Sequence, residues 1–205
     1  MSRTIAHIGE KLAAAQAPLK ARYREVPASA QLVLHAEGRI VQDDVACDVP
    51  SFLGVTRSGL HTATGGDGTL ACSGDMLLEA LVGCAGVTLA AVATAIGVAI
   101  RDSRIRADGD LDFRGTLGVD KTAAVGFTAI RLTFALDTDA SDTQMETLKK
   151  LTERYCVVYQ TLVKGVAIHT DFVRFNAVPS SGLSAIFDLS GRFRESCCAL
   201  PTPAA

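Results

Sequence analysis

The sequence lacks an excess of charge of either sign, since 20 basic and 22 acidic residues leave a formal net charge of −2. Because the sequence has no cluster of Lys and Arg residues that could bind phosphate groups, we expect no nucleic-acid partner. An acidic tail is missing too. What remains, 48% hydrophobic and 20% charged residues in a chain of 205, is typical of an ordinary soluble protein that can bury a sizeable core.

Signals for export and for zinc binding are also missing. The first 26 residues have no apolar segment followed by a small-residue cleavage site, which predicts a cytoplasmic protein, and structural disulfides are rare there. No two cysteines form a C-x-x-C pair, the four histidines are scattered, and no P-loop lysine follows the glycine-rich GGDGT segment. We therefore expect free thiols and no bound metal, nucleotide or flavin. The six cysteines are Cys47, Cys72, Cys84, Cys156, Cys197 and Cys198.

One stretch lacks charge altogether, because no residue from Ala80 to Ile100 is charged. Its 21 residues could span a membrane by length, but no Trp or Tyr stands at either end and the flanks show no clear Lys/Arg bias. A helix that is apolar all round is otherwise buried in a protein, which is the interpretation we favour over a membrane span. Four small residues in the stretch would let another helix approach closely, including one from a second subunit: Gly83, Gly86, Ala90 and Ala91.

Hydrophobic periodicity predicts strands and helices on both sides of this stretch. The first half gives a helix over residues 3–22 interrupted near Pro18, a hairpin within 30–49 that turns at Glu37-Gly38, and a long loop from Pro50. The elements expected next are a helix over 75–97, capped by Ser73, and strands within 98–118 and 123–137. A second helix is expected within 141–165, with a capping box of Ser141 and Gln144 at its start and Gly165 at its end. A last strand is expected over 166–175.

This order of elements, with one long central helix, predicts an α+β fold in which antiparallel sheet packs on helices. We expect three regions along the chain. Residues 1–29 are a helical extension, residues 30–175 form the main domain, and residues 176–205 are a tail with little pattern.

Two cysteine segments resemble those of one protein family. The segment GDMLLEALVGCAGVTLAAVATAIG around Cys84 resembles the central helix of the OsmC/Ohr family of osmotically induced and organic hydroperoxide resistance proteins. The segment YCVVYQTLVKGVAIHTDF, which begins beside Cys156, resembles the second cysteine segment of that family. The spacing of 72 positions from Cys84 to Cys156 also suits the family, and the resemblance covers roughly residues 30–175.

The resemblance implies an intertwined homodimer, with sites at the subunit interface, that acts as a thiol-dependent peroxidase on organic hydroperoxides. In the family the central-helix cysteine, here Cys84, attacks the peroxide and becomes a sulfenic acid. The later cysteine, here Cys156, condenses with it into a disulfide, which is the reversible first stage of cysteine oxidation. A hydrophobic hydroperoxide is the expected substrate, an external dithiol the expected reductant, and no membrane partner is implied.

Cys84 needs an activating group, because burial raises the pKa of a thiol and the reactive species is the thiolate. The family uses an arginine held by a glutamate ten residues before the helix cysteine, but that position is Gly74 here, with Asp75 beside it. The proline that often follows the family's second cysteine is Val157. Four arginines are candidates for the cation, with Arg57 preferred because its loop leads into the helix: Arg22, Arg24, Arg39 and Arg57.

Other interpretations of the same residues stay open at this point. Cys84 and Cys156 can be small buried apolar residues, the commonest state of a free cysteine. Cys72 can be a competing thiol, and His61 can contact the site. The missing glutamate favours the alternative function, a divergent non-catalytic protein of the OsmC fold that binds a small apolar ligand or serves as an interaction module. Cys197 and Cys198 are expected to be exposed thiols of the tail.

Overall fold

The fold is taken from a computed structural model, which describes residues 2–174. Contacts between residues divide the chain into two units. The first comprises residues 1–35 and 59–167, and the second comprises residues 36–58 and the chain from residue 168. Each unit is described by itself, and both cysteines of the expected site belong to the first.

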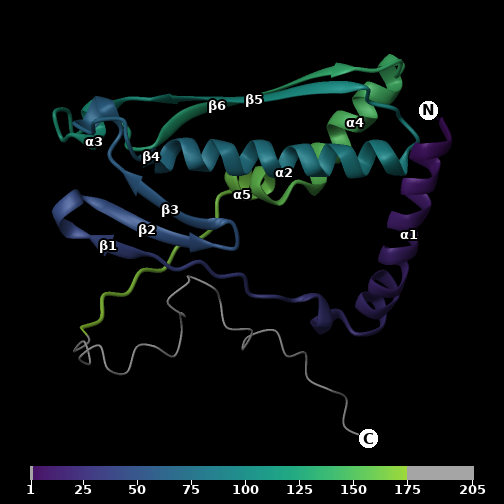
Figure 1. The fold of residues 1–205 in the computed structure, drawn as a ribbon, viewed down its shortest axis with the longest axis horizontal. Coiled ribbons are helices and arrows are strands. Elements are labelled where there is room, and N and C mark those ends of the chain that lie inside the picture. Colours follow the sequence, from purple (N-terminus) through teal and green to yellow (C-terminus); the bar gives the residue numbers. More distant parts are fainter. Residues whose placement is uncertain (1, 175–205) are drawn as a thin grey trace, which may run out of the picture. The chain divides into compact units, whose positions relative to one another are not determined.

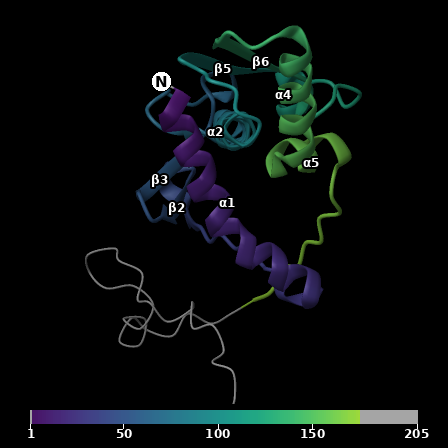
Figure 2. The ribbon, with the colours of Figure 1, turned by 90° about the vertical axis from the view of Figure 1, so that its right-hand side faces the viewer.

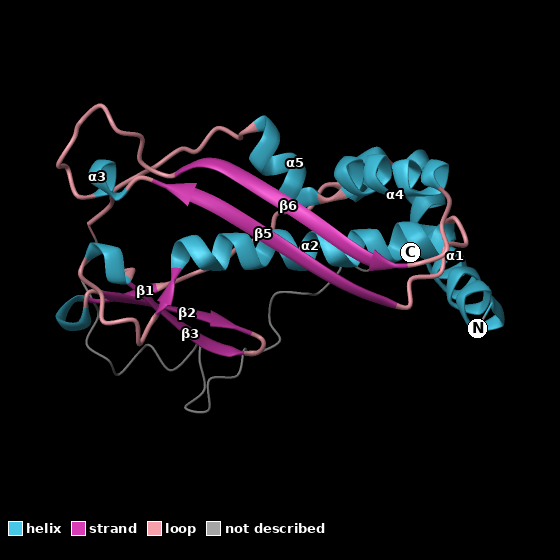
Figure 3. Cartoon of the chain, turned by 90° about the horizontal axis from the view of Figure 1, so that it is seen from above, coloured by secondary structure: helices cyan, strands magenta, loops and turns pink. Residues whose placement is uncertain are grey.

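The first unit consists of one long apolar helix with a β-hairpin and further helices around it. The hairpin lies over the helix and runs along it (Figures 1 and 3), while two shorter helices flank the long helix on one side (Figure 2). The elements of this unit are α1 (Ser2–Glu25), the 3-10 helices Pro27–Ala30 and Thr62–Thr64, β4 (Ala71–Cys72), α2 (Ser73–Ala95), β5 (Asp102–Leu111), α3 (Phe113–Thr116), β6 (Phe127–Asp137), α4 (Asp142–Tyr155) and α5 (Val157–Lys164).

Helix α2 buries one stripe of its surface and leaves the opposite face open. The buried residues recur every three or four positions, as the 3.6-residue period of a helix requires. They are Leu81, Ala85, Leu89, Val92 and Ala93. The stripe joins Val98 and Leu148 in the core, with Phe134 and Leu136 of β6 packed against them. Each fully buried large aliphatic side chain in this cluster contributes about 1.5–3 kcal/mol to folding.

Strands β5 and β6 pair antiparallel from Asp102↔Asp137 to Leu111↔Phe127, with a bulge at Asp110/Leu111. The strand predicted within 123–137 is confirmed as β6. From Ile130 onward its half-buried side chains are two residues apart and its exposed ones lie between them, because successive residues of a strand face opposite sides. The half-buried positions that face the helices are Ile130, Leu132, Phe134 and Leu136.

The second unit contains a three-stranded antiparallel meander: β1 (Arg39–Val41), the 3-10 turn Gln42–Asp44, β2 (Ala46–Ser51) and β3 (Gly54–Gly59), whose last residue falls in the first unit. The hairpin predicted to turn at Glu37-Gly38 is wrong, because the turn lies at residues 42–45. Val45 closes that turn with a positive φ of 50°, a conformation disfavoured for a β-branched residue and therefore not expected from sequence. The loop predicted from Pro50 contains β3, which sequence reasoning missed.

Three other boundaries differ from prediction. Helix α1 runs through Pro18 without a break; it is exposed around that residue, so water can satisfy the carbonyl that proline leaves unpaired. Cys72, rather than Ser73, is the N-cap of α2. The strand predicted over 166–175 is absent from residues 166–174, where no strand of the described chain pairs with this segment. An extended segment without a partner leaves its backbone groups to water.

Helix α4 begins as predicted, with a capping box in which Ser141 accepts from the Gln144 N–H and the Gln144 side chain accepts from the Ser141 N–H. The prediction of one continuous helix to Gly165 is wrong, because α4 ends at Tyr155. Cys156 adopts an extended conformation (φ −73°, ψ 111°), and α5 starts directly after it. The Gln160 side chain donates to the Glu153 carbonyl at 2.7 Å, which supplies a hydrogen bond that the interrupted helix lost. The β-branched pair Val157-Val158 weakens the helix at this point.

The α+β fold class is confirmed, with antiparallel strands packed on a long central helix. The boundaries predicted for the three regions of the chain stay a prediction. The tail from residue 176, with Cys197 and Cys198, lies outside the described residues.

Candidate active site

Cys84 lies at the boundary between the buried and the open face of α2. An ideal helix rotates 100° per residue, which puts Cys84 between the buried Leu81–Ala85 side and the side that carries the exposed Val87. Its thiol is half-buried. The groups near the sulfur that lower the pKa of the thiol are the backbone N–H groups of Val157 and Val158 at the α5 N-terminus, and the Thr88 hydroxyl one turn further along α2.

These contacts decide the charge of the thiol. Burial raises the pKa of Cys84, but the N–H of Val158, the Cys156 thiol, the N–H of Val157 and the Thr88 hydroxyl each lower it. Together these groups outweigh the effect of burial, so the pKa of Cys84 lies below the ordinary value for cysteine. The Thr88 hydroxyl donates its single proton to the Cys84 carbonyl at 2.8 Å. Within residues 2–174, none of the groups lowering this pKa is a cation.

Cys156 is the partner of Cys84 in this contact. It is fully buried, and its sulfur accepts a hydrogen bond from the Tyr159 N–H at 3.5 Å, which caps α5. Burial raises the pKa of Cys156; the Tyr159 N–H lowers it, and the neighbouring Cys84 raises it further, so the net direction is upward. The two thiols therefore differ in character: Cys84 is the readier thiolate and Cys156 the readier thiol. An acidic thiol beside a protonated one is an arrangement suited to disulfide chemistry.

The break between α4 and α5 is the feature that sequence reasoning missed. A continuous helix would bond the Val157 and Val158 N–H groups to carbonyls one turn earlier, whereas a helix that starts at Val157 leaves them free for Cys84. The first N–H groups of a helix stabilise an anion without any charged side chain. The one signal in the sequence is the β-branched Val157-Val158 pair directly after Cys156.

The N–H of Val157 provides a direct test of this arrangement. Val157 is the first residue of α5, its side chain is 70% exposed, and Cys156 before it is already extended, so proline fits this position. Val157→Pro removes one donor to the sulfur. Because a hydrogen bond stabilises the charged form of the group that accepts it, we expect the pKa of Cys84 to rise.

The measurement is the pH dependence of Cys84 alkylation by iodoacetamide, followed on its own peptide by mass spectrometry. We expect the midpoint to lie at higher pH in Val157→Pro than in the unaltered chain. Val157→Ala keeps the N–H and serves as the matched control. An equal shift in both variants would show that the side chain, and not the N–H, sets this pKa.

Gly74 and Asp75, where the family places its glutamate, do not lie beside Cys84. They begin α2, and a rise of 1.5 Å per residue puts Gly74 about 15 Å along the helix axis from Cys84. A Cβ at Gly74 would meet Phe127 at 3.5 Å and the Cys72 sulfur at 3.6 Å, which is ordinary van der Waals contact. The N-terminal turn of α2 is therefore separate from the surroundings of Cys84.

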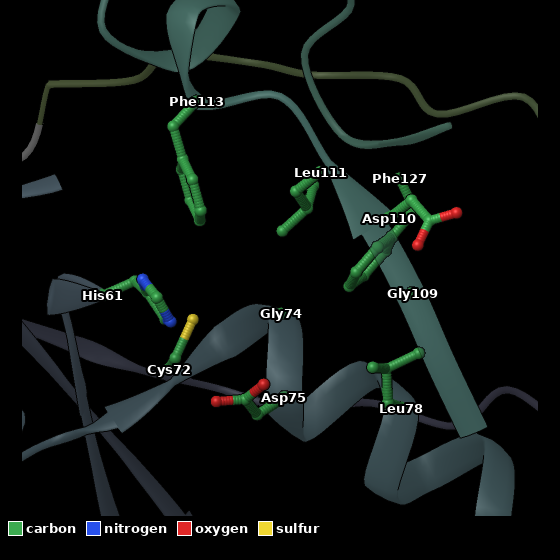
Figure 4. Close-up of a pocket in the computed structure, with 10 residues that line it drawn as sticks. All are labelled: His61, Cys72, Gly74, Asp75, Leu78, Gly109, Asp110, Leu111, Phe113 and Phe127. Atoms are coloured by element: carbon green, nitrogen blue, oxygen red, sulfur yellow. The ribbon is translucent and has the colours of Figure 1, made fainter. Parts of the chain in front are cut away.

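A cavity of about 380 Å³ opens there, shown in Figure 4. The His61 ring and the Cys72 thiol point toward one another across it, and Asp75 lies on the adjacent first turn of α2. His61 stacks on Phe113 with ring centroids 5.0 Å apart, and its Nδ1 accepts from the Ala63 N–H at 3.0 Å. Cys72 is a free thiol of this cavity, about 18 Å along the axis from Cys84. Cys72 and His61 thus belong to a different place from the Cys84–Cys156 pair.

The candidate arginines lie on other elements. Arg57 of β3 binds the Asp48 carboxylate through Nε at 2.6 Å and the Asp44 carboxylate through Nη1 at 3.2 Å, all within the second unit. The hydrogen bond from Arg57 holds the pKa of Asp48 below its usual range. Arg39 belongs to β1, and the last turn of α1 carries the other two candidates, Arg22 and Arg24.

No group of three or more His, Cys, Asp or Glu side chains in the described part of the chain could hold a metal ion. Helix α2 is long and apolar enough to cross a membrane by length and composition, a test that the core helix of a soluble protein also passes. In the first unit α2 packs against β5, α4, α5 and α1, consistent with a core helix.

The fold and the thiol pair define an α+β protein built around a central apolar helix that brings two cysteines together. The family model described as OsmC-like protein matches residues 66–171, more than half of the chain. The chain therefore belongs to the OsmC-like family. No sequence among the curated proteins matches it.

Solved structures of similar fold come from several bacteria. A putative osmotic stress induced and detoxification response protein from Psychrobacter arcticus is 10% identical with a TM-score of 0.50, covering 64% of this chain and 89% of its own. An OsmC-like protein of unknown function from Vibrio cholerae is 11% identical with a TM-score of 0.50, covering 63% and 94%. The organic hydroperoxide resistance protein OhrB of Bacillus subtilis is 20% identical with a TM-score of 0.45, covering 65% and 92%. The first two support the fold.

Proposed function

We propose that the protein is a thiol-dependent peroxidase that reduces organic hydroperoxides with Cys84 and Cys156. The observation that carries the proposal is the pairing of the two thiols beside the α5 N-terminus, which lowers the pKa of Cys84 and leaves that of Cys156 raised. Membership of the OsmC-like family and the resemblance of both cysteine segments support the same chemistry.

In the first step the Cys84 thiolate attacks one oxygen of the hydroperoxide. The O–O bond breaks, Cys84 becomes a sulfenic acid, and the alkoxide leaves and takes a proton to form the alcohol. In the second step the Cys156 thiol loses its proton and attacks the Cys84 sulfur, which forms the disulfide and releases water. An external dithiol then reduces the disulfide and is itself oxidised, so one peroxide consumes one dithiol.

The proposed substrate is lipophilic, because the residues around Cys84 are uncharged from Ala80 to Ile100 and most of them are apolar. The cycle as written involves no bound metal, nucleotide or flavin. It needs a compartment that supplies a dithiol, and the cytoplasm fits this need.

We further propose that the protein acts as a homodimer through the open face of α2. Val87 is 74% exposed and Leu77 is 38% exposed in the single chain, although neither carries a polar group. Ala80, Gly83 and Ala90 are exposed on the same face, which lets a second helix approach closely. An exposed apolar face of this kind marks an interaction site in a soluble protein.

Titration of free thiols tests the peroxidase proposal. After one equivalent of cumene hydroperoxide, we expect the reduced protein to lose two thiols, which a peptide map assigns to a Cys84–Cys156 disulfide. Cys84→Ser should lose none at this dose, whereas Cys72→Ser, which removes a thiol about 18 Å away along the axis, should still lose two. Retention of every thiol by the unaltered protein would sink the proposal.

A further inference from the structure

Helix α1 carries a stripe of apolar side chains that the described chain leaves largely uncovered. Its members recur every three or four residues, so they share one face of the helix. Ile8 is 50% exposed, Leu19 47% and Tyr23 41%. Exposed apolar side chains that gather on one face of a soluble protein mark an interaction site. The members of the stripe are Ile8, Leu12, Ala15, Leu19 and Tyr23.

Helix α1 is attached to the first unit at one side of this stripe. At Gly9 it approaches α2 so closely that a Cβ there would meet the Thr94 carbonyl oxygen at 3.3 Å. On an ideal helix Gly9 lies about 80° from Leu19, and the half-buried Leu12 and Gln16 lie on the same side. Figure 2 shows α1 crossing the end of α2 and continuing past it. The contact with α2 therefore leaves most of the stripe open.

Charged residues are distributed unevenly around the stripe. Arg22 and Lys11 lie about 60° and 80° from Leu19 on one side of an ideal helix, and Lys20 lies about 100° away on the other. Glu10 lies on the opposite face, about 180° from Leu19. Within the described residues no ion pair involves any of the three basic residues. Both borders of the stripe are thus basic, and an acidic residue lies farthest from it.

An apolar stripe with basic borders is complementary to the surface of a membrane that contains anionic lipids. Apolar side chains of such a helix enter the acyl region, while Lys and Arg extend their charges to the lipid phosphates. A second copy fits this face less well, because a two-fold interface pairs the same patch with itself and would bring cations together. Helix α1 also lies outside residues 66–171, which match the OsmC-like family model.

We propose that α1 binds the surface of a membrane containing anionic lipids, with Lys11, Lys20 and Arg22 at the level of the lipid phosphates. The helix lies in the plane of the membrane and does not span it, because its other face is polar and charged. The resemblance, which covers roughly residues 30–175, implies no membrane partner and does not extend to α1. The inference does not rest on the proposed peroxidase activity.

Sedimentation with large vesicles tests this partner, using the full reduced chain and no peroxide. Vesicles of phosphatidylcholine with about one third phosphatidylserine should bind the protein roughly tenfold more tightly than phosphatidylcholine alone. Leu19→Asp should weaken binding to the mixed vesicles roughly tenfold or more, because it places a carboxylate in the apolar stripe. Ala21→Asp is the matched control, with the same added charge at an exposed position about 200° around the helix, and should cost no more than about fivefold.

A second pair of variants tests the basic borders. Lys20→Gln combined with Arg22→Gln should lower the affinity for mixed vesicles roughly tenfold and leave any binding to neutral vesicles unchanged. Lys149→Gln combined with Lys150→Gln removes the same charge from α4 and should have little effect. Circular dichroism shows that each variant keeps its helices.

Equal binding to both kinds of vesicle, or no binding to either, would overturn the proposal. So would equal losses in Leu19→Asp and Ala21→Asp, because the stripe would then have no role. A lower mass of Leu19→Asp in light scattering without vesicles would also overturn it, since a second copy would then be the partner that covers the stripe.

Discussion

Cys156→Ser is expected to stop peroxide reduction after a single equivalent. Cys84 keeps its N–H donors from α5, so the first attack on the peroxide proceeds and a sulfenic acid forms. Without the second thiol no intramolecular disulfide can follow, and the sulfenic acid persists until it is oxidised further. Without added thiol, a dimedone adduct on the Cys84 peptide and a burst of one alcohol per chain are the expected readouts, whereas the unaltered protein should form the disulfide and no adduct.

Comparison with Cys84→Ser shows whether Cys84 is the thiol that attacks the peroxide. That variant should show no burst and no adduct, because serine cannot take the role of a thiolate at neutral pH. Cys47→Ser removes a free thiol of the second unit and serves as the control, with unchanged turnover. If Cys156→Ser turned over as fast as the unaltered protein, Cys156 would have no resolving role, although attack by Cys84 would remain possible.

Val87→Asp should convert the proposed dimer into a monomer. Val87 lies in the middle of the open apolar face of α2, and a two-fold interface repeats each substitution on both chains. A carboxylate buried without a partner costs several kcal/mol, so the dissociation constant should rise by roughly a hundredfold or more. Light scattering after size exclusion at micromolar concentration measures the change in mass.

Val119→Asp is the matched control for this substitution. Val119 is 73% exposed against 74% for Val87, but it belongs to the loop between α3 and β6 rather than to the face of α2. It should leave the mass unchanged. A monomer in the unaltered protein at micromolar concentration, or a dimer that survives Val87→Asp, would contradict an interface on this face.

The parts of the fold that sequence predicted depend on local pattern. The uncharged run around Cys84 indicated the central helix, the alternation around Ile130 indicated β6, and Ser141 with Gln144 indicated the start of α4. Each of these signals lies within a few residues of the element that it specifies. Pattern failed where a distant or solvent partner decides: α1 continues through Pro18, and the hairpin turns at Val45 rather than at Gly38.

The candidate site, too, was predicted from the sequence only in part. The resemblance in sequence indicated Cys84 and Cys156, and in the structure the two thiols lie near enough for each to shift the pKa of the other. A search for a charged side chain could not find the groups that lower the pKa of Cys84, because they include the backbone N–H groups of Val157 and Val158. Every residue except proline carries such a group, so its role depends only on where a helix begins.

The burial of Cys156 has a consequence for how the proposed cycle is reset. Thiol–disulfide exchange is faster when the departing sulfur has the lower pKa, so a reductant gains most by attacking the Cys156 sulfur and expelling Cys84. Cys156 is 0% exposed, however, while Cys84 is partly open. Access and leaving-group ability therefore oppose each other in the proposed cycle: the Cys84 sulfur is the one a reductant can reach, but attack there expels the less acidic Cys156 thiol.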